Sequence, residues 1–211
     1  MITKLMNILT PEAIYGLICA TVFCVIFAVA GKARHAQHYT FSQGLVLVLF
    51  LLYLWQVWMF TGVGTLSNVL AGKGKFTLSG LMRSVSLLPF QSLGTSFFLN
   101  IVMCLPLGFL LPFLWKNFRR FWKVGMMGLL LSLLTETSQL FNFRTSDVDD
   151  LIANIAGTLL GYGIWKLCNL VFGERLRKSR NSQAEAVVYL LLSFAGIFLL
   201  YNESWFANFL L

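Results

Sequence analysis

The sequence contains few charged residues, and this shortage excludes most classes of soluble protein. Only 11% of its 211 residues are charged, whereas 58% are hydrophobic. A typical soluble domain has about 25% charged residues and is at most about half apolar. The mean hydropathy is +0.77. This composition excludes a soluble globular enzyme, a disordered chain and a disulfide-rich scaffold, and it predicts an all-α, polytopic membrane protein.

Cysteine and histidine are also scarce, which argues against a metal or redox centre. The four cysteines, Cys19, Cys24, Cys104 and Cys168, lie within apolar runs, and no two of them form a C-x-x-C pair. We interpret them as small packing residues. The two histidines lie three residues apart in a short loop, with no carboxylate or cysteine nearby. We therefore expect no metal site and no bound cofactor.

Long apolar runs occupy most of the chain and predict about six transmembrane helices. Each run is long enough to cross about 30 Å of hydrocarbon at about 1.5 Å per residue. Too few residues remain for an appended soluble domain, so we expect one transmembrane domain over residues 1–211. The stretch Ala28-Val29-Ala30 resembles a signal-peptidase site, but the long apolar run before it favours a retained first span. We place the helices at residues 12–30, 44–63, 97–115, 121–141, 150–172 and 185–201.

The distribution of basic residues predicts the orientation. The net charge of +8 arises from 16 Lys and Arg against 8 Asp and Glu. A basic chain can indicate nucleic-acid binding, but here the basic residues lie in short loops between apolar runs, as is typical of cytoplasmic loops in membrane proteins. We therefore expect no nucleic-acid partner, both termini outside the cell, and three cytoplasmic loops that contain Lys32, Arg34, Lys116, Arg119, Arg120, Lys123, Arg175, Arg177, Lys178 and Arg180.

The outer loop between the second and third predicted helices, residues 65–96, is long and half-apolar. Its residues 78–90 could form an interfacial or re-entrant segment. Lys73, Lys75 and Arg83 lie in this loop, and Arg144 adds a fourth basic residue to the outer side. These charges could be ordinary solvated side chains, or they could attract an anionic phosphate or carboxylate group.

Polar residues within the apolar runs are costly in a membrane, so their positions are informative. In the fourth span, Gly128, Ser132, Glu136 and Gln139 have the spacing of one helical face. Glu136 could be a neutral or hydrogen-bonded carboxyl retained for helix packing. We favour a functional role, because an ionisable residue at this depth is more often functional than structural.

The fifth span begins with three carboxylates, Asp147, Asp149 and Asp150. Helix capping explains one of them, with Ser146 or Asp147 as the N-cap residue. It does not require three, because neighbouring carboxylates repel one another and need a compensating cation, either basic side chains or a metal ion. Capping alone and a functional cluster therefore both remain open.

Small residues follow the acidic cluster along one face of the fifth span. Asn154, Gly157 and Gly161 lie on this face, and Gly157-x-x-x-Gly161 allows close approach of another helix. The third span has a similar stripe of Asn100, Cys104 and Gly108. We expect one polar site where the three spans meet on the outer side. Its candidate ligand-binding residues are Arg83, Asn100, Glu136, Gln139, Arg144, Asp147, Asp149, Asp150 and Asn154, and its candidate packing residues are Gly108, Gly128, Gly157 and Gly161.

Residues 80–165 resemble the VanZ-like family. The resemblance depends on an ensemble of short motifs, in which Ser86 stands where the family often has Asn. The motifs are Leu87-Leu88-Pro89-Phe90, Asn100, Pro106-Leu107-Gly108, Glu136-x-x-Gln139 and Arg144-x-x-Asp147-x-Asp149-Asp150-x-x-x-Asn154-x-x-Gly157-x-x-x-Gly161. The resemblance implies a multi-pass protein of a Gram-positive bacterial cell membrane. The family's named member gives low-level resistance to teicoplanin, a glycopeptide with a fatty acyl chain, without remodelling the peptidoglycan stem peptide.

Three functional hypotheses follow from the polar residues and this resemblance. The leading one is a protein without a known reaction that binds an amphiphile at the outer leaflet, either a lipoglycopeptide or an undecaprenyl-linked cell-wall precursor. The second is an intramembrane enzyme that uses the carboxylates with Mg²⁺ on a polyprenyl diphosphate. The third is a lipid transporter or flippase, although the spans show no internal repeat. The expected partners are membrane lipids and one of these ligands.

Overall fold

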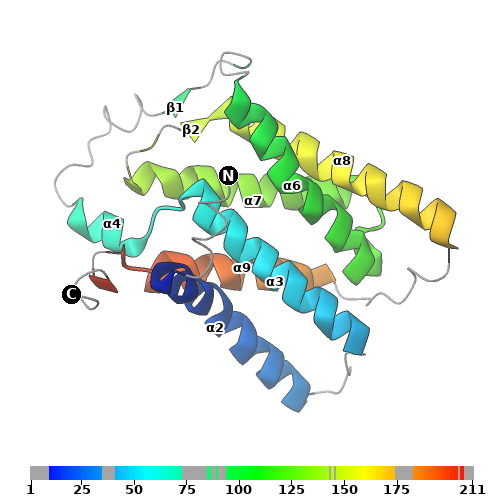
Figure 1. Cartoon of the computed structure of the whole chain (residues 1–211), viewed down its shortest axis with the longest axis horizontal. Coiled ribbons are helices and arrows are strands. Elements are labelled where there is room, and N and C mark those ends of the chain that lie inside the picture. The colour runs from blue at the N-terminus through cyan, green and yellow to red at the C-terminus, as the bar shows by residue number, and fades with distance from the viewer. Residues whose placement is uncertain are drawn as a thin grey trace.

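The computed structural model describes residues 10–34, 41–72, 85–86, 89, 94–142, 144, 146–173, 183–203 and 205–206. Within these ranges the chain is almost entirely helical, which confirms the all-α prediction (Figure 1). Two short 3₁₀ turns, Lys116–Phe118 and Leu140–Asn142, connect or extend the helices. The α-helices are α2 (Pro11–Arg34), α3 (Phe41–Thr61), α4 (Leu66–Ala71), α6 (Thr95–Leu114), α7 (Phe121–Gln139), α8 (Val148–Phe172) and α9 (Gln183–Leu200).

The long helices coincide with the predicted spans to within a few residues. In the described part of the chain, five helical stretches are long and apolar enough to cross a membrane. The sixth predicted span corresponds to α9, whose apolar stretch, Ala184–Leu200, is shorter than the other five. The chain therefore folds as a polytopic membrane protein, in which the last helix has about its predicted length and is shorter than the other spans.

Two packed groups make up the helical bundle. In one group, α8 packs against both α6 and α7, and in the other, α2 packs against α9 and α3 (Figure 1). The first turns of α2 and the end of α9 meet, since Tyr15 Oη donates to the carbonyl oxygen of Leu200 at 2.6 Å and the rings of Tyr15 and Tyr201 stack at 5.3 Å. The start of the first span and the end of the last therefore lie at the same end of the bundle, as an even number of crossings requires.

Large aromatic side chains fill the centre of the bundle. Trp58 of α3 is buried and donates from Nε1 to Ser193 Oγ of α9 at 3.0 Å. Trp115, just after α6, is also buried, packs edge-on against Phe50 with ring centroids 5.3 Å apart, and donates from Nε1 to Glu185 Oε2 at 2.8 Å. These bonds satisfy the indole N–H groups, which would otherwise be costly in an apolar interior.

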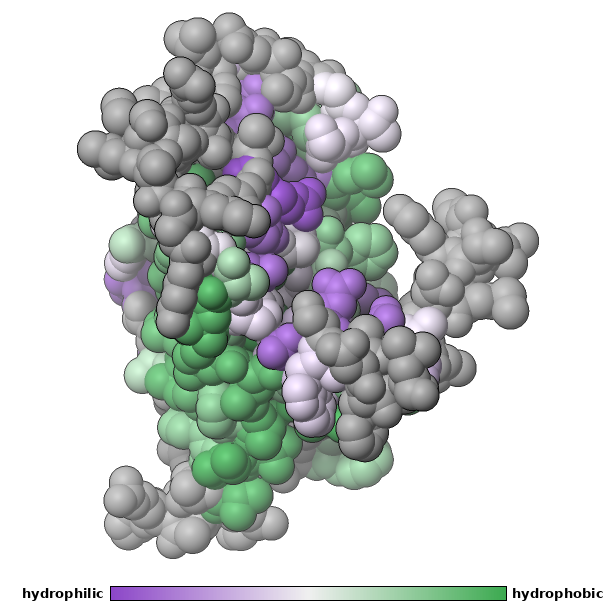
Figure 2. All heavy atoms as spheres, turned by 90° about the vertical axis from the view of Figure 1, so that its left-hand side faces the viewer, coloured by the Kyte–Doolittle hydropathy of each residue, from purple (hydrophilic) through white to green (hydrophobic). Residues whose placement is uncertain are grey.

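The outward faces of the helices are apolar, as expected of surfaces in contact with hydrocarbon. Ile18, Ile26, Leu160 and Leu167 are each more than half exposed. Figure 2 looks onto the side that holds α4, β1 and the end of α7, and it shows hydrophilic residues gathered together beside a broad hydrophobic surface. Polar residues thus gather at the end of the bundle that this view shows.

Two short features between the long helices were not predicted. The helix α4 follows α3 after a turn at Gly62, which has a φ of 63°. Strand β1 (Val85–Ser86) pairs in parallel with strand β2 (Ser146–Asp147), with Val85 opposite Ser146 and Ser86 opposite Asp147. This pairing brings the chain between α4 and α6 onto the residues just before α8. The remainder of the predicted interfacial segment 78–90 lies outside the described residues, apart from Pro89.

Candidate functional site

The helices α6 and α8 approach so closely that only glycine fits at the contact. A Cβ added to Gly157 would overlap the backbone of Ile101, and one added to Gly161 would overlap the backbone of Leu105. From the other side, a Cβ on Gly108 would overlap the carbonyl oxygen of Thr158. These packing contacts hold the two helices backbone to backbone, which is the usual role of small residues between transmembrane helices.

The third helix of the site, α7, approaches the same part of α8. A Cβ on Gly128 would lie 2.6 Å from the side-chain oxygen of Thr158. Thr158 is fully buried and donates to the backbone carbonyl of Asn154 at 2.8 Å. Gly128 therefore allows α7 to lie against the turn of α8 that carries Asn154.

Asn154 connects all three helices by side-chain hydrogen bonds. Its Nδ2 donates to Ser132 Oγ on α7 at 3.0 Å, and its Oδ1 accepts from Cys104 Sγ on α6 at 3.2 Å. Both partners are fully buried, and Asn154 itself is 2% exposed. Cys104 therefore acts as a hydrogen-bond donor as well as a packing residue, which the sequence analysis did not predict.

One turn nearer the end of the bundle, Asn100 and Asp150 form a second bond between α6 and α8. Asn100 Nδ2 donates to Asp150 Oδ1 at 2.6 Å, and both residues are half-buried. A hydrogen bond to an ionised carboxylate is shorter and stronger than one between neutral groups. Both residues were predicted to belong to one polar site, and the structure brings their side chains into direct contact.

The acidic residues before and within the first turn of α8 have separate structural roles. Asp147 is the N-cap residue, with Oδ1 accepting from the backbone N–H of Asp149 at 3.0 Å. The backbone N–H of Asp147 itself donates to Glu136 Oε2 at 3.2 Å. Glu136 is 7% exposed and Asp149 is fully buried. Several carboxylates thus gather at the positive end of the α8 dipole, which stabilises negative charge.

A second group of side chains from the end of α7 caps the end of α3. Gln139 Nε2 and an Arg144 N–H group both donate to the carbonyl oxygen of Thr61, at 2.7 and 3.0 Å. Asn142 Nδ2 donates to the carbonyl oxygen of Gly62 at 2.9 Å. These bonds satisfy carbonyl groups that a helix leaves unpaired at its C-terminus.

The predicted site residues therefore fall into two connected groups. Asn100, Glu136 and the residues of α8 from Asp147 to Asn154 form one group across α6, α7 and α8, whereas Gln139 and Arg144 point to the end of α3. Arg83, Lys73 and Lys75 lie outside the described residues. Sequence reasoning missed the part played by Thr61, Gly62 and Asn142. The Thr-Gly pair at the end of an apolar run is a signal that a helix ends there. It does not reveal which side chains donate to the carbonyl groups left unpaired at that end.

No group of three or more His, Cys, Asp or Glu side chains in the described part of the chain has an arrangement that could hold a metal ion. The Asp147 carboxylate accepts from the backbone N–H of Asp149, and the Asp150 carboxylate accepts from Asn100 on another helix. The carboxylates of Asp147 and Asp150 therefore have different hydrogen-bond partners.

The fold and these contacts define a class of protein, an all-helical polytopic membrane protein with a polar cluster at one end of its bundle. A family model described as VanZ/LLP1 matches residues 14–169. Because the match covers more than half of the chain, this protein belongs to the VanZ/LLP1 family. The match extends beyond the resemblance at residues 80–165 to include most of α2 and all of α3. Comparisons with curated proteins and with solved structures gave no match.

Proposed function

We propose that this protein binds the head group of an amphiphile at the outer leaflet of a Gram-positive cell membrane and so contributes to resistance to a lipoglycopeptide such as teicoplanin. The observation that carries the proposal is the position of the Asn100–Asp150 pair. This half-buried polar pair lies near the start of α6, where the other side of the same helix turn carries Phe98, Leu99 and Val102, which are 60–63% exposed. A polar pair at the same depth as an apolar, lipid-facing surface matches a ligand with a polar head and an acyl chain.

The residues of the cluster contribute in different ways. Asn154 is buried within the bundle, so it positions α6, α7 and α8 rather than touching the ligand. Asn100, Asp147 and Asp150 are half-buried, and they offer hydrogen-bonding groups to a bound head group. Arg144 is exposed, and its bond to Thr61 uses one of the five N–H donors of a guanidinium group. It supplies the attraction for an anionic group of the ligand.

The experiment compares binding of teicoplanin with binding of the same glycopeptide lacking its acyl chain, using the purified full chain in detergent. We expect binding of teicoplanin, much weaker binding of the deacylated form, and loss of binding in Asp150→Asn and Arg144→Gln. A matched control is Glu203→Gln, since Glu203 is an exposed acid just after α9, at the same end of the bundle. Expression in a susceptible Gram-positive host should raise the teicoplanin concentration needed to stop growth.

Three results would contradict this proposal. Equal binding of the acylated and deacylated forms would show that the exposed apolar surface of α6 takes no part. A teicoplanin effect that depends on added Mg²⁺ and is accompanied by turnover of a polyprenyl diphosphate would favour the enzymatic hypothesis instead. Movement of a labelled lipid between leaflets, abolished by the same substitutions, would favour the flippase.

A further inference from the structure

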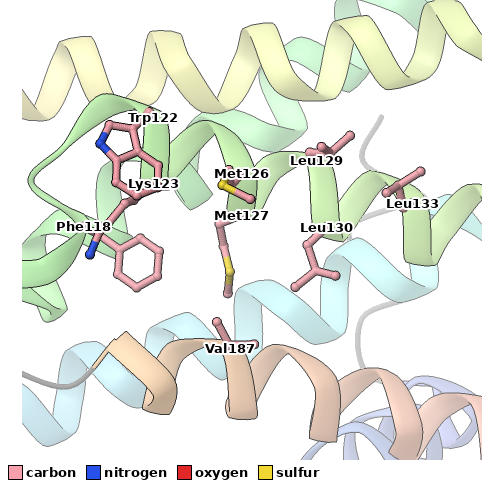
Figure 3. A pocket seen from close by; sticks show the side chains of 9 residues that line it. All are labelled: Phe118, Trp122, Lys123, Met126, Met127, Leu129, Leu130, Leu133 and Val187. Atoms are coloured by element: carbon pink, nitrogen blue, oxygen red, sulfur yellow. The ribbon is translucent and has the colours of Figure 1, made fainter.

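A second, separate feature is a groove between α7 and α9, away from the polar cluster. Its volume is about 320 Å³. Ligand pockets begin at about this size. Figure 3 shows Met127 and Leu130 pointing from α7 toward Val187 on α9, with Phe118, Trp122 and Lys123 at one end. The lining is apolar except for Lys123. The groove therefore has the character of an acyl-chain site with one basic end.

The length of the groove matches a single leaflet of the membrane. Between Lys123 and Leu133, the two ends of its lining on α7, the helix rises about 15 Å at about 1.5 Å per residue. The hydrocarbon core of a bilayer is about 30 Å thick, so the groove reaches from one surface to about the middle. This depth suits one acyl chain that enters from the basic end.

The charge at that end favours an anionic head group. Residues 116–123 contain Lys116, Arg119, Arg120 and Lys123 and no acid. Lys123 Nζ lies 5.5 Å from the ring centroid of Trp122, and Trp and Lys together are typical of the membrane–water interface. Glu185, the acid in the first turn of α9, accepts a hydrogen bond from the buried Trp115.

We propose that the α7–α9 groove binds one acyl chain of an anionic phospholipid from the cytoplasmic leaflet, with the lipid phosphate at Lys123 and Arg120. The basic end of the groove lies at the opposite end of α7 from Glu136 and Gln139. It is therefore independent of the outer ligand proposed above. Basic pockets between transmembrane helices on the cytoplasmic side are suited to anionic lipid head groups.

The test is native mass spectrometry of the purified full chain with added phosphatidylglycerol or with phosphatidylcholine of the same acyl chains. Phosphatidylglycerol should be retained more strongly, and Lys123→Gln should lower its retention about fivefold, because one basic residue near an anionic lipid is worth about 1 kcal/mol. The matched control is Lys166→Gln on α8. Lys166 is exposed and follows Trp165 in α8. The guanidinium carbon of Arg119 lies 5.7 Å from the ring centroid of Trp165, so Lys166 lies at the same end of the bundle as Lys123. The control should retain the lipid as the unsubstituted chain does.

A second pair of variants tests the groove itself. Val187→Trp should fill it and reduce phosphatidylglycerol retention, whereas Leu160→Trp, on the exposed face of α8, should not. Equal retention of the two lipids, or equal losses in Lys123→Gln and Lys166→Gln, would overturn the proposal. So would a dimer that disappears only in Val187→Trp, because a second copy of the chain would then occupy the groove. Thermal unfolding of each variant checks that it is folded.

Discussion

Glu136 of α7 accepts a hydrogen bond from the backbone N–H of Asp147 at 3.2 Å, so a buried carboxylate of one helix holds the first residues of the next. Glu136 lies inside the apolar run of α7, where an acid is costly. The contact places it against the N-terminal end of α8, where the helix dipole favours a negative charge. The buried acid Glu136 is thus stabilised by the N-terminal end of α8.

Replacing Glu136 should separate folding from function. Glu136→Gln keeps an oxygen acceptor for the N–H of Asp147, so we expect unfolding close to that of the unsubstituted chain but loss of teicoplanin binding. Glu136→Ala leaves that N–H without its acceptor, and it should lower the free energy of unfolding by about 1–3 kcal/mol. Thermal unfolding in detergent and the binding assay measure the two effects. Thr137→Val, on the exposed side of the same turn, is the control. Full binding by the Gln variant would remove the carboxylate from the site.

The three aspartates should differ in what they contribute. Asp147→Asn keeps the cap of α8, because Asn and Asp cap helices about equally well. Asp150→Asn keeps an acceptor for Asn100. We therefore expect each single Asn variant, including Asp149→Asn, to fold, and Asp150→Asn to lose teicoplanin binding. If the triple Asn variant expressed normally and bound the ligand fully, capping and packing would be the whole role of these carboxylates.

Asn154 should stabilise the bundle through its two side-chain partners. Hydrogen bonds between transmembrane helices are worth about 0.6 kcal/mol on average and up to about 1.7 kcal/mol. A double-mutant cycle of Asn154→Ala and Ser132→Ala, measured by unfolding, should give a coupling energy in that range. Leu160→Ala, on the lipid-facing side of the same helix, should show no coupling with Ser132→Ala. If the changes in the free energy of unfolding were additive for Asn154→Ala and Ser132→Ala, the hydrogen bond between these residues would contribute nothing to stability.

Two glycines of α8 should respond oppositely to the same substitution. Gly157→Ala places a methyl group against the backbone of Ile101, and such overpacking typically costs about 1–3 kcal/mol. Gly163 has no atom within 4 Å of its added Cβ, so Gly163→Ala should be neutral or stabilise the helix by about 0.5–1 kcal/mol. Equal unfolding temperatures for the two variants would contradict the close α6–α8 packing.

The sequence predicted the helices well because hydrocarbon imposes long apolar runs whose ends are marked by loop charges. It also predicted that Asn100 and Asp150 belong to one polar site, since helical spacing fixes how far along its span each residue lies. It did not predict that Gln139 and Arg144 cap α3, because that contact depends on how α7 lies against a helix distant in sequence. The pairing of Ser86 with Asp147 was missed for a related reason. Two residues are too few to show the alternation of a strand.

The proposed function requires the polar cluster to lie on the outer face of the membrane, and cysteine labelling in intact cells tests this most directly. Arg144→Cys at the polar end and Arg120→Cys at the opposite end both substitute exposed positions, in a background where the half-buried Cys168 is replaced by Ser. A membrane-impermeant maleimide should label Arg144→Cys in intact cells and Arg120→Cys only after permeabilisation. The reverse pattern would place Asn100, Glu136 and Asp150 on the cytoplasmic side and would contradict binding of a ligand from the outer leaflet.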